Sequence, residues 1–225
     1  MAKIITIAQQ KGGAGKTSLA AHLAAYWASN TKGIPKNGSL VNDPNHRAIT
    51  LVDLDPQGSL STWFQTREER GVDTETLSLR GGAGWKVNSE IQSAQKNSDL
   101  IIIDSPPHSE TSTRIGIRHA DIVVVPLQLS PMDIWATRTT MDLIKKEKRP
   151  VLMVFNRVPP RGRLATDLKD RLQGEDLPIA RSTLGNRAAY ASSLMTGKGV
   201  TETDPRSLAA TEIRDLAKEV LKRIK

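Results

Sequence analysis

Short apolar runs recur along the chain, separated by stretches in which polar and apolar positions mix. The runs occupy residues 4–8, 49–53, 100–104, 121–126 and 151–156. Runs of this length indicate strands that are buried on both faces of a sheet. Because strands that alternate with helices form parallel sheets with helices on both faces, the pattern predicts an α/β fold with a mostly parallel central sheet.

The stretches between the runs predict helices. We expect one helix from the glycine-rich turn through about residue 29, a second over about 58–70 and a third over about 133–148. Residues 177–184 are expected to hold a last strand, and about 205–224 a long amphipathic helix with one broad apolar face. A chain of 225 residues fits a single domain that spans residues 1–225.

One segment is longer than the fold requires. Residues 30–48 are rich in Asn, Gly, Pro and Lys, whereas strands and helices of such units are usually joined by roughly 2–6 residues. The segment is therefore predicted to be an inserted loop. It is either a tolerated surface insertion or an element that docks a partner or touches DNA.

The clearest chemistry follows the first apolar run. The sequence Lys11-Gly12-Gly13-Ala14-Gly15-Lys16-Thr17 places a glycine-rich turn between a predicted strand and a predicted helix, which is the layout of a phosphate-binding loop. Backbone N–H groups and the start of the helix would cradle phosphate oxygens. Lys16 is expected to reach the β- and γ-phosphates of ATP, and the Thr17 hydroxyl to ligate Mg²⁺. The predicted nucleotide-binding residues are Lys11, Gly12, Gly13, Ala14, Gly15, Lys16, Thr17 and Ser18.

The loop departs from the usual pattern at its start. The form G-x-x-x-x-G-K-[ST] needs glycine at position 10, where this chain has Gln10, and a second lysine, Lys11, precedes Lys16 by five residues. A lysine beside a phosphate loop needs a negative charge to offset its own. That charge lies either on its own nucleotide or on one bound by a facing copy of the protein, and the second alternative makes dimer formation depend on ATP.

Acidic residues follow two of the predicted strands. Asp53 and Asp55 are two residues apart, so on a strand they would project from the same face. Asp104 ends the next apolar run, and ligands of open parallel sheets bind beyond such ends. Asp104 therefore suits holding Mg²⁺, directly or through water. One acid after a strand is common, but three behind a phosphate loop predict a magnesium-ATP site.

These motifs resemble those of the ParA family of partition ATPases, within the deviant Walker A group that also holds the MinD-type ATPases. The resemblance rests on residues 11–17, on Asp53-Leu54-Asp55-Pro56-Gln57-Gly58 and on Ile102-Ile103-Asp104-Ser105-Pro106-Pro107, with a looser match over 187–200. It implies that Lys11 crosses a nucleotide-sandwich homodimer. It further implies that Asp55 positions or activates the attacking water and that Asp53 belongs to the magnesium shell.

By this resemblance, the catalytic candidates are Lys11, Lys16 and Asp55, and the metal candidates are Thr17, Asp53 and Asp104. The resemblance also makes Asn156 a candidate for adenine binding, with residues 157–160 as a wall of the base pocket. A simple strand-end cap is the alternative role for Asn156.

Charge gives a second indication of function. The formal net charge is +8, and between residues 138 and 163 eight basic residues stand against two acids. Such a run is often only a solvated face, but this bias favours a polyanionic partner. Because phosphate contacts carry no sequence information, we expect non-specific, salt-sensitive DNA binding. The candidate contacts are Lys145, Lys148, Arg149, Arg161, Arg163 and Arg187.

Composition excludes several classes of protein. The chain has no cysteine, which excludes disulfides, thiolate metal sites and the iron–sulfur reductases of this fold. The four histidines show no ligand spacing and are expected on the surface or in loops. No apolar run approaches the roughly 20 residues that span a bilayer, and the chain enters a strand directly after Met1, which leaves no room for a signal peptide. We therefore expect a cytoplasmic protein, and the resemblance to ParA ATPases implies a nucleoid-associated one of bacterial or archaeal origin.

Taken together, these features predict an ATP-dependent dimerising switch. It would bind non-specific DNA and partition or position a plasmid, chromosome region or other large cargo, with slow hydrolysis until an activating ParB-like or cargo-adaptor protein engages. A MinD-type membrane-cycling ATPase is one alternative, with residues 208–224 as its lipid-binding helix. We expect no stable membrane association, because a terminal helix of this fold normally packs on the sheet. A small-molecule ATP-dependent ligase is the other alternative, which the Asp55-Pro56-Gln57 stretch and the basic bias disfavour.

Overall fold

The computed structural model describes residues 1–30, 34, 47–82, 86–107, 109–160, 163–174 and 177–224. Of residues 163–166, 173 and 174 it describes the backbone alone. The predicted inserted loop at 30–48 lies almost entirely outside the described residues, so its role stays a prediction.

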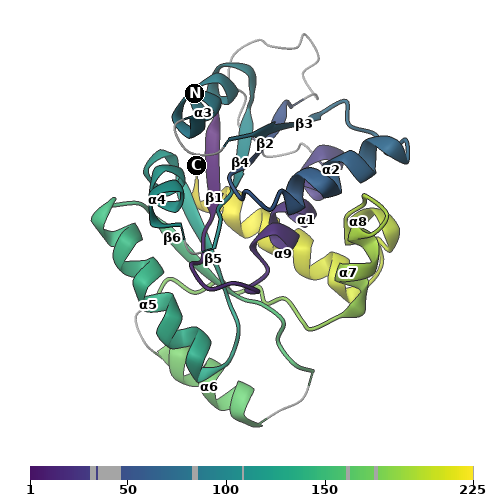
Figure 1. Ribbon diagram of the computed structural model, residues 1–225. Coiled ribbons are helices and arrows are strands. Elements are labelled where there is room, and N and C mark those ends of the chain that lie inside the picture. Colours follow the sequence, from purple (N-terminus) through teal and green to yellow (C-terminus); the bar gives the residue numbers. More distant parts are fainter. Residues whose placement is uncertain are drawn as a thin grey trace.

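The centre of the molecule is a sheet of six parallel strands in the order β3-β2-β4-β1-β5-β6 (Figure 1). The strands are β1 (Lys3–Ile7), β2 (Ile49–Asp53), β3 (Leu77–Gly81), β4 (Leu100–Asp104), β5 (Ile122–Leu127) and β6 (Val151–Phe155). Asp104 is in register with Ile7 on one side and with Asp53 on the other. The last residues of β1, β2 and β4 therefore meet at one edge of the sheet, which confirms the predicted fold class.

Helices cover both faces of this sheet (Figure 1). One face carries α1 (Lys16–Ser29), α2 (Ser59–Glu69), α7 (Ala188–Leu194), α8 (Val200–Thr203) and α9 (Leu208–Arg223). The other carries α3 (Val87–Asn97), α4 (Glu110–His119), α5 (Pro131–Lys146) and α6 (Arg163–Gly174). Adjacent strand residues alternate between the two layers, as Ile4 and Ile5 do. Both faces of the inner strands are buried, which explains why those strands are largely apolar, whereas the edge strand β3 includes the exposed Ser78.

The predicted last strand at 177–184 is wrong. This segment forms only an isolated parallel bridge between Ile179 and Met153 of β6. Pro178 contributes its carbonyl to Met153, but it has no N–H for a continuing ladder. The chain then leaves β6 and returns near its end, where Leu184 donates to the carbonyl of Phe155.

The predicted amphipathic helix at the end of the chain is confirmed as α9, which begins at Leu208. Ser207 caps it, since its hydroxyl accepts from the N–H of Ala210. The apolar face, including Ile213 and Val220, is buried in the same core layer as α1 and the sheet. That face is therefore not free to lie in a lipid surface. No helix in the described part of the chain is long and apolar enough to span a bilayer.

The expectation that every histidine lies on the surface or in a loop is wrong for His22. This residue lies in the middle of α1 and is only 2% exposed. Helices α7, α8 and α9 contact α1 in addition to the sheet, so α1 is buried along most of its length. His22 Nδ1 accepts from the N–H of Val200 at 3.2 Å, and the imidazole ring meets Tyr190 edge to face.

The burial of His22 makes stability depend on pH. Burial lowers the pKa of His22 from its ordinary 6.5 to about 4, although a backbone contact at Tyr190 opposes the shift. Between these two values the unfolded chain binds a proton that the folded chain does not. The stability due to neutral His22 is therefore complete above about pH 6.5 and declines as the pH falls towards 4. We predict a loss of about 2 kcal/mol in unfolding free energy between about pH 7 and pH 5.

Urea unfolding at several pH values measures this loss. A His22→Gln variant keeps an acceptor for the N–H of Val200 but cannot titrate, so it should lose less stability over the same interval. Parallel pH profiles for the two proteins would contradict the assignment.

Candidate nucleotide-binding site

The phosphate-binding loop joins the end of β1 to the start of α1. Gly13 and Gly15 adopt φ values of 76° and 91°, a left-handed conformation that favours glycine. Gly15 also lies so close to Asn156 that an added Cβ would collide with its side-chain amide. The first N–H groups of α1 therefore open onto the loop, as an anion cradle requires.

Lys16 and Thr17 sit at the base of this loop. Lys16 is 6% exposed, and its Nζ donates to the carbonyl of Lys11 at 3.5 Å. Burial lowers the pKa of Lys16, while the carboxylates of Asp104 and Asp55 raise it. Thr17 Oγ1 donates to Asp104 Oδ2 at 2.6 Å. The structure thus brings together the lysine, the hydroxyl and the strand-end acid that the sequence predicted.

Asp104 has an unused oxygen. Its Oδ2 is taken by Thr17, but its buried Oδ1 accepts no hydrogen bond from the described residues. Burial raises the pKa of Asp104 to about 7, the bond from Thr17 opposes this, and the nearby charge of Asp53 adds to it. A buried carboxylate oxygen without a partner is costly, so it fits a site for a cation. The described residues contain no group of three His, Cys, Asp or Glu suited to a metal. Mg²⁺ is usually held by one or two carboxylates together with phosphate and water, so the free oxygen of Asp104 is suited to it.

Asp53 uses both of its oxygens within the protein. Oδ2 accepts from the N–H and the hydroxyl of Ser61 at 2.9 and 2.7 Å, and Oδ1 accepts from the N–H of Asp55 at 3.1 Å. Asp53 thereby fastens the first turn of α2 to the end of β2. Its place in a magnesium shell stays a prediction.

Asp55 does not share a strand face with Asp53, contrary to the sequence interpretation. Strand β2 ends at Asp53, and Asp55 lies in the following turn with its Oδ1 accepting from the N–H of Gln57 at 3.0 Å. It lines a cavity of about 540 Å³ together with Lys16, Thr17 and Trp63. Asp55 therefore faces the same space as the phosphate-binding lysine, from the opposite side of the cleft between α1 and α2.

Lys11 forms an ion pair within its own chain. Its Nζ lies 2.8 Å from Oδ1 of Asp133, a buried residue in the first turn of α5. Ser130 caps the same turn and hydrogen-bonds to Asp133. The Lys11 side chain stays 36% exposed, so it lies at the rim of the site.

The residues before Lys11 fasten the loop to α5. Gln9 is buried, donates to Thr137 at 2.8 Å and accepts from Thr140 at 2.9 Å. The N–H of Gln10 donates to Thr140. The start of the loop is thus held by the helix that supplies the partner of Lys11.

Asn156 braces the loop from the end of β6. Its Nδ2 donates to the carbonyl of Ala14 at 2.8 Å, and its Oδ1 accepts from the N–H of Arg157 at 2.9 Å. Asn156 also lines a cavity of about 450 Å³ with Gly15, Gly185 and Arg157. The observed role is therefore loop bracing, beside a space suited to a base, and contact with adenine stays a prediction.

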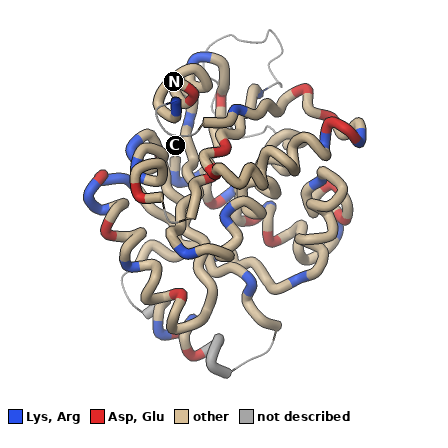
Figure 2. The backbone as a smooth tube through the Cα atoms, viewed as in Figure 1, with Lys and Arg blue, Asp and Glu red and all other residues tan. Residues whose placement is uncertain are grey.

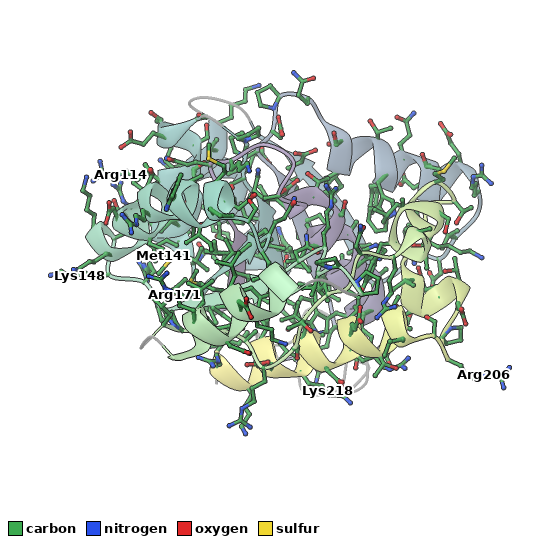
Figure 3. All side chains as sticks on the ribbon, turned by 90° about the horizontal axis from the view of Figure 1, so that it is seen from below. Arg114, Met141, Lys148, Arg171, Arg206 and Lys218 are labelled. Atoms are coloured by element: carbon green, nitrogen blue, oxygen red, sulfur yellow. The ribbon has the colours of Figure 1, made fainter. Side chains whose placement is uncertain are left out.

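Three of the candidate DNA contacts lie apart from this site. Lys145, Lys148 and Arg149 are exposed at the end of α5, beside Arg114 and Arg118 of α4, which both bind Glu147. Figure 2 shows blue segments gathered there, and Figure 3 shows Arg114 and Lys148 on the same side of the molecule, far from Arg206.

The other candidate contacts are not part of that cluster as described. Arg187 is committed to Glu212 through a two-pronged ion pair at 2.7 and 3.1 Å. Arg161 lies outside the described residues, and so does the side chain of Arg163.

Sequence reasoning missed Asp133 and Ser61. Asp133 had a signal, because Ser130-Pro131-Met132-Asp133 has the helix-start pattern of a capping residue, proline at the first position and an acid in the first turn. Ser61 had none, since its bond to Asp53 depends on how α2 returns to the end of β2.

Known proteins resemble this chain over most of its length. The family model described as ATPase MipZ matches residues 3–148. "Maintenance of carboxysome distribution protein A" of Halothiobacillus neapolitanus is 25% identical over 224 residues, covering 96% of this chain and 95% of the relative. "Chromosome-partitioning ATPase Soj" of Thermus thermophilus is 27% identical over 255 residues, covering 98% and 96%. The solved structure of septum site-determining protein MinD of Pyrococcus horikoshii with Mg-ADP has a TM-score of 0.71 at 19% identity, covering 98% of this chain and 96% of that one.

The matched family segment covers more than half of the chain and contains the loop, both acid-bearing strand ends and Asp133. The structural likeness, at 19% identity, bears on the fold alone. The chain therefore belongs to the MipZ ATPase family, among the ParA/MinD-type P-loop ATPases that its loop motif predicted.

Proposed function

We propose that this ATPase is a dimerising switch that positions a large cargo on DNA. The observation that carries the proposal is the second lysine of the loop. Lys11 lies at the rim of the phosphate site, about one-third exposed, and one carboxylate of its own chain holds it. An ammonium group in this place is suited to exchange that carboxylate for the triphosphate of a facing subunit.

ATP and Mg²⁺ are the cofactors of this activity. The N–H groups of the loop and Lys16 bind the phosphates, while the Thr17 hydroxyl and the unpaired oxygen of Asp104 fit Mg²⁺. When bound, magnesium-ATP supplies the phosphoryl group to be transferred. Asp55, across the cavity from Lys16, orients the attacking water, and Asp53 holds the turn that carries Asp55.

Dimerisation follows from nucleotide binding. A ligand present at about a hundredfold over its dissociation constant supplies roughly 2.7 kcal/mol of linkage. This is enough to shift a weak dimer equilibrium by about two decades. Hydrolysis removes the γ-phosphate, so Lys11 returns to Asp133 and the subunits separate.

Binding of the dimer to DNA provides the track for the cargo. The exposed cations at the end of α5 supply phosphate contacts, and a dimer offers twice as many as a monomer. The relatives named for carboxysome distribution and chromosome partitioning support a positioning role. An activating ParB-like or cargo-adaptor protein speeds hydrolysis, and the DNA-bound dimer resides on the nucleoid.

A membrane-cycling function is less well supported. It would require the apolar face of α9 to reach lipid, and that face packs on α1 and the sheet.

We predict that Lys11→Ala abolishes ATP-dependent dimers, because each subunit then lacks the ammonium group that would contact the triphosphate of its partner. Light scattering with a slowly hydrolysed ATP analogue and Mg²⁺ should give about the monomer mass of 24.6 kDa, whereas the parent protein gives about twice that value. Lys3→Ala is the matched control, since Lys3 also pairs with an aspartate at comparable exposure, 3.8 Å from Asp121. A nucleotide-dependent dimer of Lys11→Ala would exclude the trans role.

We predict that replacing Lys145, Lys148 and Arg149 by Glu weakens DNA binding and leaves nucleotide affinity unchanged. Anisotropy with random-sequence duplex should show a log–log salt slope that is smaller by about three per protomer, at about 0.9 for each lost phosphate contact. The control variant replaces Arg70, Lys96 and Arg206, three exposed cations elsewhere on the surface, by Glu. It therefore changes the net charge by the same amount as the test variant. Equal weakening in both proteins would show a dependence on net charge rather than on this patch.

A further inference from the structure

The short helix α8 joins the two helices that carry the halves of the ATP site. On one side, the N–H of Val200 donates to His22 of α1. On the other side, Glu202 binds Arg67 of α2 through both of its carboxylate oxygens, at 2.7 and 2.9 Å. Glu202 also accepts from the N–H of Gly199 at 2.7 Å, which closes the first turn of α8.

The ion pair between Arg67 and Glu202 is largely buried, with side chains 2% and 15% exposed, and both carboxylate oxygens are used. Arg67 is 1% exposed, and its guanidinium also donates to the carbonyls of Asp73 and Gly197 at 3.0 and 3.1 Å. The same group lies 5.8 Å from the ring of Trp63, one turn earlier in α2. A planar guanidinium with so many fixed acceptors can adopt only one orientation. Because Arg67 lies near the end of α2, these hydrogen bonds also fix the position of that end of the helix.

The turn before α8 approaches both helices closely because two of its residues are glycines. A Cβ on Gly197 would lie 2.5 Å from the backbone N and Cα of Arg67, and Gly197 has a φ of 69°. A Cβ on Gly199 would lie 2.5 Å from the Cβ of Ala25 in α1. Any larger residue at either position would push one of the helices away.

These contacts act on the site through the stiffness of the two helices. Helix α1 begins with Lys16 and Thr17, whereas α2 follows the turn that contains Asp55 and is tied to Asp53 through Ser61. The cavity between them includes Trp63 and Thr66 in its wall. A change in the separation of α1 and α2 at α8 would therefore be transmitted along both helices towards Lys16 and Asp55.

A buried ion pair is weak evidence for stability, since an apolar pair of similar volume often stabilises as well or better. An apolar pair, however, does not form the directional hydrogen bonds that fix the orientation of one helix relative to another. We propose that Arg67 and Glu202 are positioning residues for ATP hydrolysis, which clasp α2 to α8 and thereby place Asp55 opposite the phosphate-binding loop. The inference rests on the proposed role of Asp55.

Two conservative variants test the clasp. Arg67→Lys keeps the positive charge but loses the planar guanidinium that binds both carboxylate oxygens. Glu202→Gln keeps the shape of the side chain but loses the negative charge. Each should lower the rate of single-turnover phosphate release by about tenfold, since a small misplacement far from the chemistry is enough for such a loss. The dissociation constant of a fluorescent ATP analogue should change by less than about twofold, because the loop and Lys16 are untouched. Arg70→Lys, an exposed arginine three positions further along the chain, is the matched control and should hydrolyse ATP at the parent rate.

A double variant separates positioning from stability. Arg67→Met with Glu202→Leu fills the same space without charge, so its melting temperature should exceed that of Arg67→Met alone. Its hydrolysis should stay low, because the directed bonds are absent. Recovery of hydrolysis together with stability would reduce the pair to a structural role and overturn the proposal, as would parent-like rates in both conservative variants. If either conservative variant fails to fold, the double variant still decides.

The variant Asp55→Ala distinguishes a failure of the clasp from a failure of the proposed role of Asp55. Normal hydrolysis by Asp55→Ala would remove the proposed role of Asp55 and the clasp with it. If Asp55→Ala does not hydrolyse ATP while Arg67→Lys and Glu202→Gln do so at the parent rate, the clasp alone is overturned.

Discussion

The site depends on how the protein offsets two ammonium groups that flank one short loop. Lys16 is buried between the carboxylates of Asp104 and Asp55, which oppose the lowering of its pKa by burial. Lys11 is offset by Asp133 from a different helix. Two like charges on one short loop, each partly removed from water, require separate partners. The parallel sheet meets this requirement because the ends of β2 and β4 and the start of α5 all converge on the loop.

The two lysines differ in exposure, and the difference supports different roles. Lys16 is fixed under the loop, where it has no path to another subunit. Lys11 lies at the rim on an ion pair that is about one-third exposed on the lysine side, so its ammonium group is accessible to another partner, and Asp133 keeps its hydrogen bond from Ser130 when Lys11 leaves. The switch we propose uses this contrast. Lys16 binds the nucleotide of its own subunit, and Lys11 contacts the nucleotide of a second copy. The clasp at α8 sets the distance between Asp55 and the phosphate-binding loop.

Much of this could be predicted from the sequence, because the decisive signals are local. The loop, the buried strands and the strand-end acid Asp104 follow from short motifs and from parallel topology. The pair of Arg67 and Glu202 and the burial of His22 could not be predicted, because each joins segments far apart in the chain. The bond from Ser61 to Asp53 could not be predicted either, because it depends on how α2 returns to the end of β2. The expected strand over 177–184 failed for a local reason, since Pro178 and its neighbours make only a single bridge.

The most direct test of the central claim mixes two inactive variants. In a nucleotide-sandwich dimer, Lys11→Ala lacks the lysine it gives to its partner, and Asp55→Ala lacks the acid of its own site. If Lys11 acts across the interface, each mixed dimer contains one complete site, and an equal mixture should regain about a quarter of the parent ATPase rate. If Lys11 acts within its own subunit, every site in the mixture stays incomplete, and the absence of any recovered activity would contradict the account.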